Sequence, residues 1–126
     1  MRLLLDTAVL IWAASEPERL TRRARAALKS SGNVVELSAI SLSEIAIKQS
    51  LGKLTFSDGD ARQALTDLGI RILPYTGDHA FLLFDLPLAH SDPFDRQIIA
   101  QALSENIPVV TPDQKFSLYD GLKLIW

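Results

Sequence analysis

The chain of 126 residues contains no cysteine, only one methionine, and no more than 6 glycines and 6 prolines. The absence of cysteine excludes a disulfide framework and a thiolate metal site. With 48% hydrophobic and 22% charged residues, the composition excludes disorder, low-complexity arrays and collagen-like repeats. A net charge of −2 at pH 7 excludes a protein coated with basic residues for tight nucleic-acid binding, although it permits a local basic strip.

Long apolar runs are also missing. Asp6 interrupts the run Leu3-Leu4-Leu5, and the next apolar stretch, Ala8 to Ala14, is too short for a membrane span of about 20 residues. We therefore expect no signal peptide and no membrane segment, but a soluble cytoplasmic protein. The length predicts a single domain over residues 1–126.

Short apolar runs alternate with longer segments of helical period. We expect strands at 3–5, 34–37, 70–73, 109–110 and 122–126, and helices at 7–14, 21–30, 42–51, 59–68, 77–85, 93–105 and 113–118. This order predicts an α/β fold in which helices cover both faces of a mostly parallel sheet. Gly32, Gly52 and Gly69 follow three of these helices, where a left-handed C-cap is expected.

Four acidic residues stand near the predicted carboxyl ends of strands. Asp6 follows the first strand, Glu44 opens the helix after the second, Asp95 opens the helix after loop 86–92, and Asp113 follows Val109-Val110. Ligands of open α/β sheets bind outside the carboxyl ends of the strands. We therefore expect the four carboxylates to share one edge of the sheet.

Helix capping offers another explanation for each acid. Ser41-Leu42-Ser43-Glu44 has the form of a capping box. Asp92-Pro93-Phe94-Asp95 and Thr111-Pro112-Asp113 each look like an N-cap, a proline at the first helical position and an acid in the first turn. Asp6 can end a strand or favour a helix dipole. This explanation predicts no convergence of the acids.

Convergence of the four acids predicts a metal site. Carboxylates close together destabilise a fold unless a cation compensates their charge. Oxygen ligands without cysteine or a suitable histidine pair favour Mg²⁺ or Mn²⁺. Such an ion orients a phosphodiester, neutralises its charge and lowers the pKa of an attacking water. The arrangement therefore favours metal-assisted phosphodiester hydrolysis.

Four ordered segments carry a resemblance to a known family: Leu3–Trp12, Ser41–Lys48, His90–Ala102 and Thr111–Phe116. They resemble the successive motifs of PIN-domain ribonucleases, and among these the VapC toxins of type II toxin–antitoxin pairs. The resemblance runs from the first expected strand to the last. It implies a three-layer α/β/α fold, Mg²⁺- or Mn²⁺-dependent endoribonuclease activity, a homodimer, and inhibition by a cognate antitoxin.

The resemblance maps the family's catalytic and metal-binding quartet onto Asp6, Glu44, Asp95 and Asp113. We expect four supporting residues beside the quartet. They are Thr7 in the first motif, Thr111 at the hydroxyl position of the last motif, Asp92 as an N-cap near the cluster, and Arg96 as a phosphate ligand or a counter-charge to the acids. Ala8, Ser43 and Pro112 depart from the family pattern without touching the quartet, so they leave the choice of RNA target open.

Other residues allow two interpretations each. Arg19, Arg22, Arg23 and Arg25 form either a solvated helix face or a strip that steers RNA. His79 and His90 are too isolated to form a metal pair, so we expect them to pack in a helix or loop. The run from Phe81 to Phe84 belongs to the core or to a protein interface.

Three other functions compete with the ribonuclease. A haloacid-dehalogenase-type phosphatase needs a second aspartate two residues after the first, where Ala8 stands. A phospho-receiver module needs an acidic pair after the first strand, where Thr7 follows Asp6. A catalytically silent α/β binding or regulatory domain, whose acids are helix caps, stays open. The leading hypothesis is an endoribonuclease that cleaves RNA through metal-activated water.

Overall fold

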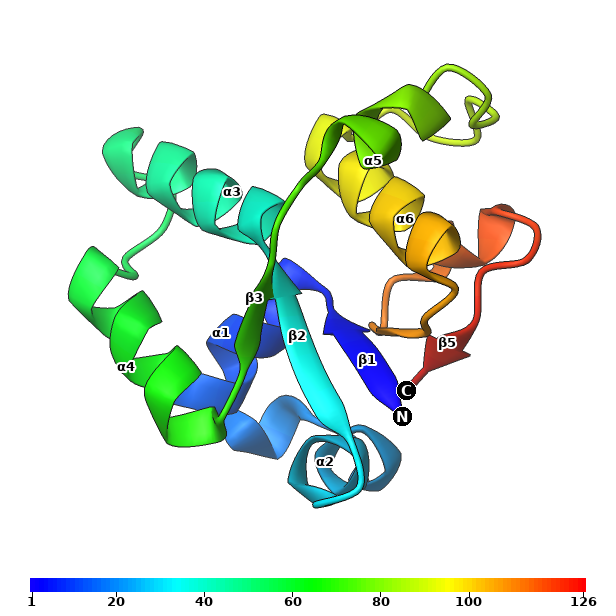
Figure 1. Ribbon diagram of the computed structural model, residues 1–126. Helices are drawn as coiled ribbons and strands as arrows, with labels where there is room; N and C mark the ends of the chain where they lie inside the picture. The colour runs from blue at the N-terminus through cyan, green and yellow to red at the C-terminus, as the bar shows by residue number, and fades with distance from the viewer.

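The computed structural model describes residues 1–126 and contains a five-stranded sheet with helices on both sides (Figure 1). The strand order is β3-β2-β1-β4-β5, and every pairing between neighbours is parallel. The strands are β1 (Arg2–Leu5), β2 (Val34–Ser38), β3 (Arg71–Leu73), β4 (Val109–Val110) and β5 (Leu124–Ile125). The predicted α/β class and parallel sheet are confirmed.

Six α-helices and two 3₁₀ helices connect these strands. They are α1 (Thr7–Ser15), η1 (Pro17–Arg19), α2 (Arg22–Lys29), α3 (Ala39–Ser50), α4 (Asp58–Leu68), α5 (Gly77–Leu82), α6 (Pro93–Glu105) and η2 (Gln114–Leu118). Each predicted helix exists, although α3 begins earlier and α5 ends earlier than expected. No helix combines the length and the apolar character that crossing a bilayer requires.

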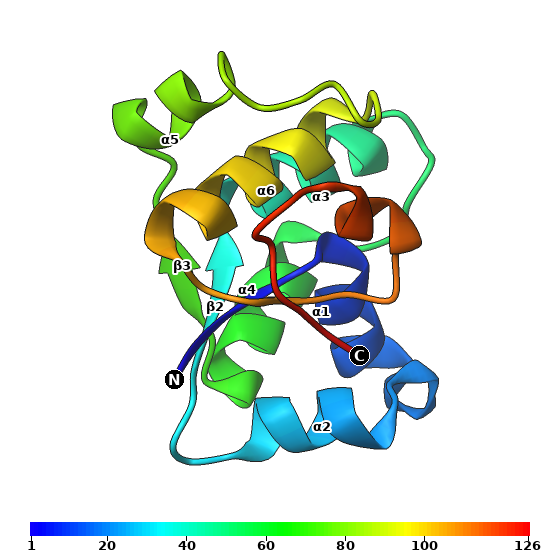
Figure 2. The same cartoon turned by 90° about the vertical axis from the view of Figure 1, so that its right-hand side faces the viewer.

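The side chains of β1 alternate between two hydrophobic cores. Leu3 and Leu5 pack in the core that lies against α1, α2 and α4. Leu4, between them, packs in the other core, against α6 and β4. Figures 1 and 2 show the resulting layers, with the sheet between the two groups of helices. Burial of both faces explains why the strand sequences are apolar without alternation.

Helix α3 starts directly from the end of β2, with no loop between them. The side chain of Ser38, the last residue of β2, accepts a hydrogen bond of 3.0 Å from the backbone N–H of Ile40 and is the N-cap. Ser41 is fully buried inside the helix. The predicted Ser41–Glu44 capping box is therefore wrong, and Glu44 lies in the second turn of α3 rather than at its start.

The two other predicted helix starts differ in outcome. Asp92 caps α6, because its Oδ1 accepts hydrogen bonds from the backbone N–H groups of Phe94 and Asp95 at 2.9 and 3.0 Å. In the last motif, Asp113 itself is the N-cap and accepts from the N–H of Lys115 at 2.9 Å. Pro112 therefore precedes η2, and its predicted place in a first helical turn is wrong.

Two of the three predicted glycine C-caps have left-handed backbone. Gly52 has a φ of 70° and Gly69 a φ of 63°, which glycine adopts without the steric cost that a Cβ brings. Gly32 does not adopt this conformation, so that prediction is wrong. Asn106 ends α6 in left-handed backbone instead, with a φ of 54°.

Candidate active site

Asp6 and Asp113 are joined through a threonine between them. Asp6 follows β1, and Thr111 follows the neighbouring β4. The hydroxyl of Thr111 donates to Asp6 Oδ2 at 2.7 Å, and its oxygen accepts from the backbone N–H of Asp113 at 3.0 Å. Burial raises the pKa of Asp6, the Thr111 hydrogen bond opposes this rise, and the charges of Glu44 and Asp113 add to it.

Glu44 is buried on α3 and bonded on both of its oxygens. The Thr7 hydroxyl oxygen lies 2.8 Å from Glu44 Oε1 and 2.8 Å from Ser41 Oγ. Because a hydroxyl has one proton, Thr7 donates to the carboxylate and accepts from Ser41. Lys48 Nζ donates to Glu44 Oε2 at 2.6 Å. This hydrogen bond raises the pKa of Lys48, and the charges of Asp92 and Asp95 raise it further.

Asp95 lies in the first turn of α6 and faces the other acids. The pKa of its carboxyl is raised to about 7, first by burial and then by the charges of Asp92, Asp6, Glu44 and Asp113. His90 Nε2 lies 3.3 Å from Asp95 Oδ2. Carboxylates raise one another's pKa only when they lie close together. The structure thus places all four predicted acids, together with Asp92, at the carboxyl edge of the sheet.

The acidic cluster, defined as Asp6, Glu44, Asp92, Asp95 and Asp113, has the donor chemistry of a hard-cation site. It offers oxygen ligands alone, which Mg²⁺ and Mn²⁺ prefer. No three His, Asp or Glu side chains are drawn together closely enough to enclose an ion. The carboxylates bind hydroxyl, ammonium and imidazole groups instead. Mg²⁺ needs only one or two direct carboxylates and keeps several waters, so the cluster fits such an ion.

Helix capping accounts for only part of the cluster. Asp92 and Asp113 cap helices. Asp6 stands at the N-cap position of α1 but makes no side-chain capping hydrogen bond. Glu44 accepts from the side chains of Thr7 and Lys48, and Asp95 Oδ2 lies against His90, so neither caps a helix through these oxygens. The capping explanation therefore leaves three of the five acids unexplained.

Lys48 is a site residue that sequence reasoning missed. Its distance of four positions from Glu44 on one helix was the available signal, because residues i and i+4 lie side by side. The turn at Gly52 brings Lys53 back toward it, where the backbone N–H of Lys53 donates to Lys48 O at 2.9 Å. A cavity of about 210 Å³ beside Glu44 is lined by Thr7, Ala8, Ile11, Ile45, Lys48, Lys53 and Leu54.

Arg96 contacts Tyr119 and the preceding loop instead of the acids. Its guanidinium donates to Pro87 O at 2.7 Å, to Tyr119 Oη at 3.0 Å and to Leu86 O at 3.3 Å. It forms no ion pair with an acid. The expected function as counter-charge is therefore wrong in this structure, and Arg96 instead anchors the loop before α6.

The arginine strip lies far from the acidic cluster. Figures 1 and 2 both show α2 at one end of the molecule and α3 and α6 at the other. Arg19 stacks over the ring of Trp12, with its guanidinium carbon 4.0 Å from the ring centroid. The remaining arginines on α2 belong to the edge opposite the acids. The position of the arginine strip therefore does not support a role in steering RNA into this site.

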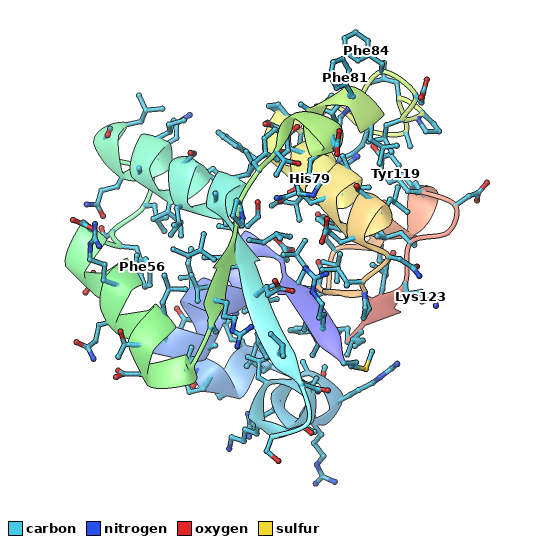
Figure 3. All side chains as sticks on the ribbon, in the orientation of Figure 1. Phe56, His79, Phe81, Phe84, Tyr119 and Lys123 are labelled. Atoms are coloured by element: carbon cyan, nitrogen blue, oxygen red, sulfur yellow. The ribbon has the colours of Figure 1, made fainter.

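The structure also places the two histidines and the phenylalanines for which the sequence left the role open. His79 is buried, with Nε2 3.0 Å from Glu105 Oε2, whereas His90 contacts Asp95, so the two histidines do not form a pair. Phe81 and Phe84 stack on each other and project from the molecule (Figure 3), with Phe84 85% exposed. Of the two interpretations of this run, core packing is therefore wrong for both phenylalanines, and a protein interface stays open.

Comparisons with known proteins agree on the fold. The chain is similar to the structure of VapBC2 from Rickettsia felis bound to a promoter DNA fragment, with a TM-score of 0.74, 19% identity, and 98% of this chain and 97% of that chain covered. DNA-bound VapBC from Salmonella typhimurium gives a TM-score of 0.66 at 20% identity, with 98% and 96% covered. VapBC-5 from Mycobacterium tuberculosis gives 0.60 at 20% identity, with 98% and 96% covered. No curated protein is matched.

A family model matches nearly the whole chain. The model of the PIN domain matches residues 3–122, which includes all four segments that carry the acids. Because this match extends over nearly the whole sequence, the chain belongs to the PIN domain family.

Proposed function

We propose that this protein is a metal-dependent endoribonuclease and the toxin of a VapBC-type toxin–antitoxin pair. Family membership supports the nuclease. The toxin assignment is supported by similar structures that are described as VapBC complexes, one of them as a member of a family of toxin–antitoxin systems. In this proposal residues 1–126 form one PIN domain, which acts in the cytoplasm as a homodimer and is inhibited by a cognate antitoxin.

The nuclease proposal rests on where the four acids lie. Thr111 joins Asp6 to Asp113, and Thr7, the residue after Asp6, holds Glu44. The charges of these three acids raise the pKa of Asp95, in agreement with this placement. These acids come from four separate segments of the chain, and a bound cation relieves the repulsion among carboxylates placed so close together. In the proposal the four carboxylates hold Mg²⁺ or Mn²⁺. When bound, such an ion supplies charge neutralisation on the phosphodiester and a lower pKa for the attacking water.

Two threonines keep the carboxylates in place. Thr111, directly after β4, holds Asp6, and Thr7, at the start of α1, holds Glu44. Both hydroxyls are buried, so each bond is shielded from competing water. These residues therefore fit the supporting roles expected of them, since they fix the orientation of acids on different segments.

Lysines beside the cluster suit the charge of an RNA backbone. The Lys48 side chain is 42% exposed, and its ammonium pairs with Glu44. Lys53 is exposed and pairs with no acid. Both line the cavity of about 210 Å³. In the proposal Lys53 binds a phosphate next to the scissile one, and the apolar wall formed by Ile11 and Leu54 accommodates the adjoining nucleoside.

Four isosteric variants test the nuclease directly: Asp6→Asn, Glu44→Gln, Asp95→Asn and Asp113→Asn. Each deletes one negative charge and keeps the side-chain shape. We expect each to abolish cleavage of total RNA in Mg²⁺ or Mn²⁺, and EDTA to abolish cleavage by the unchanged protein. Retention of full activity in these variants would contradict the assignment.

A matched control separates a metal site from helix capping. Asp60 caps α4 through a capping box with Ser57 and lies outside the acidic cluster. Asp60→Asn is expected to retain full cleavage. If instead it is as inactive as Asp95→Asn, the losses reflect helix stability and the nuclease proposal fails.

The toxin proposal has a separate test. A short reading frame next to the gene is expected to encode a DNA-binding antitoxin. Co-expression of the two should yield a complex that no longer cleaves RNA, and light scattering should find a dimer of this chain without its partner. A monomer, or a complex with full activity, would contradict these parts of the proposal.

A further inference from the structure

His90 and Tyr119 form a hydrogen-bonded chain that ends at Asp95. Tyr119, which follows η2, lies beside α6 (Figure 3). His90 Nδ1 lies 2.7 Å from Tyr119 Oη, and His90 Nε2 lies 3.3 Å from Asp95 Oδ2. Both side chains are buried. Neither capping nor metal ligation accounts for this chain of contacts.

The direction of each proton follows from counting donors around the tyrosine oxygen. The backbone N–H of His90 donates to Tyr119 Oη at 3.3 Å, and the guanidinium of Arg96 donates to it at 3.0 Å. A phenol oxygen has two lone pairs and one proton. The two donors occupy the lone pairs, so the tyrosine proton is left to point at His90 Nδ1. That nitrogen is then an acceptor, and the ring proton resides on Nε2.

Packing fixes the position of the imidazole ring. The ring lies edge-on to Tyr119, with centroids 5.4 Å apart, and is tilted against Phe116 at 6.5 Å. Arg96 holds the segment before His90 by donating to Pro87 O at 2.7 Å and Leu86 O at 3.3 Å. The Nε2–H is therefore held in one direction, toward Asp95.

We propose that Tyr119 positions the Asp95 carboxylate through His90, by fixing the Nε2–H tautomer of the imidazole. At 3.3 Å the bond to Asp95 is long for a charge-assisted hydrogen bond, so it contributes direction rather than strength. It keeps Oδ2 turned toward the loop and leaves the other oxygen for the acidic cluster. His90 and Tyr119 are positioning residues, and their role in cleavage rests on the proposed nuclease function.

The tautomer is measurable without metal or RNA. The chain has only 2 histidines, so the ¹⁵N resonances of their side chains can be assigned by single substitution. In the unchanged protein we expect His90 to carry its proton on Nε2. In Tyr119→Phe, Nδ1 loses its donor, and a substantial fraction of the Nδ1–H form is expected.

His79 is the internal control for this spectrum. Its Nδ1 accepts from the backbone N–H of Thr76 at 3.0 Å, which Tyr119 does not contact. Its resonances should stay unchanged in Tyr119→Phe. A His90 tautomer that carries its proton on Nδ1 in the unchanged protein, or one that Tyr119→Phe does not alter, would overturn the proposal.

Cleavage kinetics distinguish positioning from a general structural effect. Substituting a residue that hydrogen-bonds to a metal ligand costs about 10–100-fold in metal affinity or activity. For His90→Phe, which fills the ring site without nitrogen, we expect an increase of about 10-fold in the Mn²⁺ concentration for half-maximal cleavage, with little change in KM for RNA. His90→Gln places an N–H near the position of Nε2 and should restore most of the loss.

Different results would refute the positioning role of His90 and the nuclease function. Cleavage by the unchanged protein, together with equal Mn²⁺ dependence in His90→Phe and His90→Gln, would refute the positioning role and leave the nuclease intact. A tautomer that changes in Tyr119→Phe, with no cleavage by any form, would refute the nuclease and leave the hydrogen-bonded chain intact.

Discussion

Asp95→Asn is expected to stabilise the metal-free protein at pH 8 and to have little effect near pH 4. Burial and four neighbouring carboxylates raise the pKa of Asp95 from 3.8 to about 7. The folded state therefore binds more protons at this group than the unfolded state does between these two values. The free energy of unfolding accordingly falls as the pH rises through this window and levels off above pH 7.

The size of the effect follows from the pKa difference. A rise of about 3 units corresponds to about 4 kcal/mol at roughly 1.4 kcal/mol per unit. The Asp95 side chain is 15% exposed, so solvent screening reduces this free energy to about 2–3 kcal/mol. For a chain of this length, roughly 3–5 °C per kcal/mol gives a rise in Tm of about 10 °C. The asparagine Oδ1 can still accept from His90.

Thermal unfolding by circular dichroism in EDTA measures this difference. Asp120→Asn, at an exposed aspartate outside the acidic cluster, is the control and should leave Tm unchanged at both pH values. An unchanged Tm for Asp95→Asn at pH 8 would refute the claim of electrostatic repulsion. An equal gain at pH 4 and pH 8 would assign the stabilisation to packing instead of charge.

Two further predictions concern the lysine beside the site and the threonine inside it. Lys53→Glu should raise KM for RNA and reduce the slope of log affinity against log salt concentration by about 1. Arg23→Glu, on the far edge, should change neither quantity. Equal effects of the two variants would contradict the proposed position of the RNA beside Lys53. Thr111→Val should lower the free energy of unfolding in urea by about 1–3 kcal/mol at pH 8, because the buried Asp6 loses its donor. A loss below about 0.5 kcal/mol would show that water replaces the hydroxyl.

The location of the acids could be predicted from sequence because it depends on local order and topology. Apolar strands separated by helices favour parallel pairing, and residues after parallel strands meet at one edge. Asp6 and Asp113 obey this rule directly, since each follows its strand within a few residues. The sequence thus predicted which edge of the sheet carries the site.

Details of the site depended on contacts that no local pattern contains. Ser38, Ser41 and Ser43 are all of a residue type that caps helices, so the sequence did not reveal that Ser38 is the cap and that α3 begins at Ala39. The path from Tyr119 to His90 joins residues 29 positions apart. Arg96 binds backbone carbonyls, which carry no sequence signal. Tertiary packing decided each of these features.

The central claim is that the acidic cluster binds a divalent cation. An anomalous difference map from crystals soaked in Mn²⁺ tests it most directly. We predict a manganese peak at the carboxyl edge of the sheet, in contact with Asp6 and at least one other acid of the quartet. A saturated crystal with no peak there, or with manganese bound only at other surfaces, would contradict the claim.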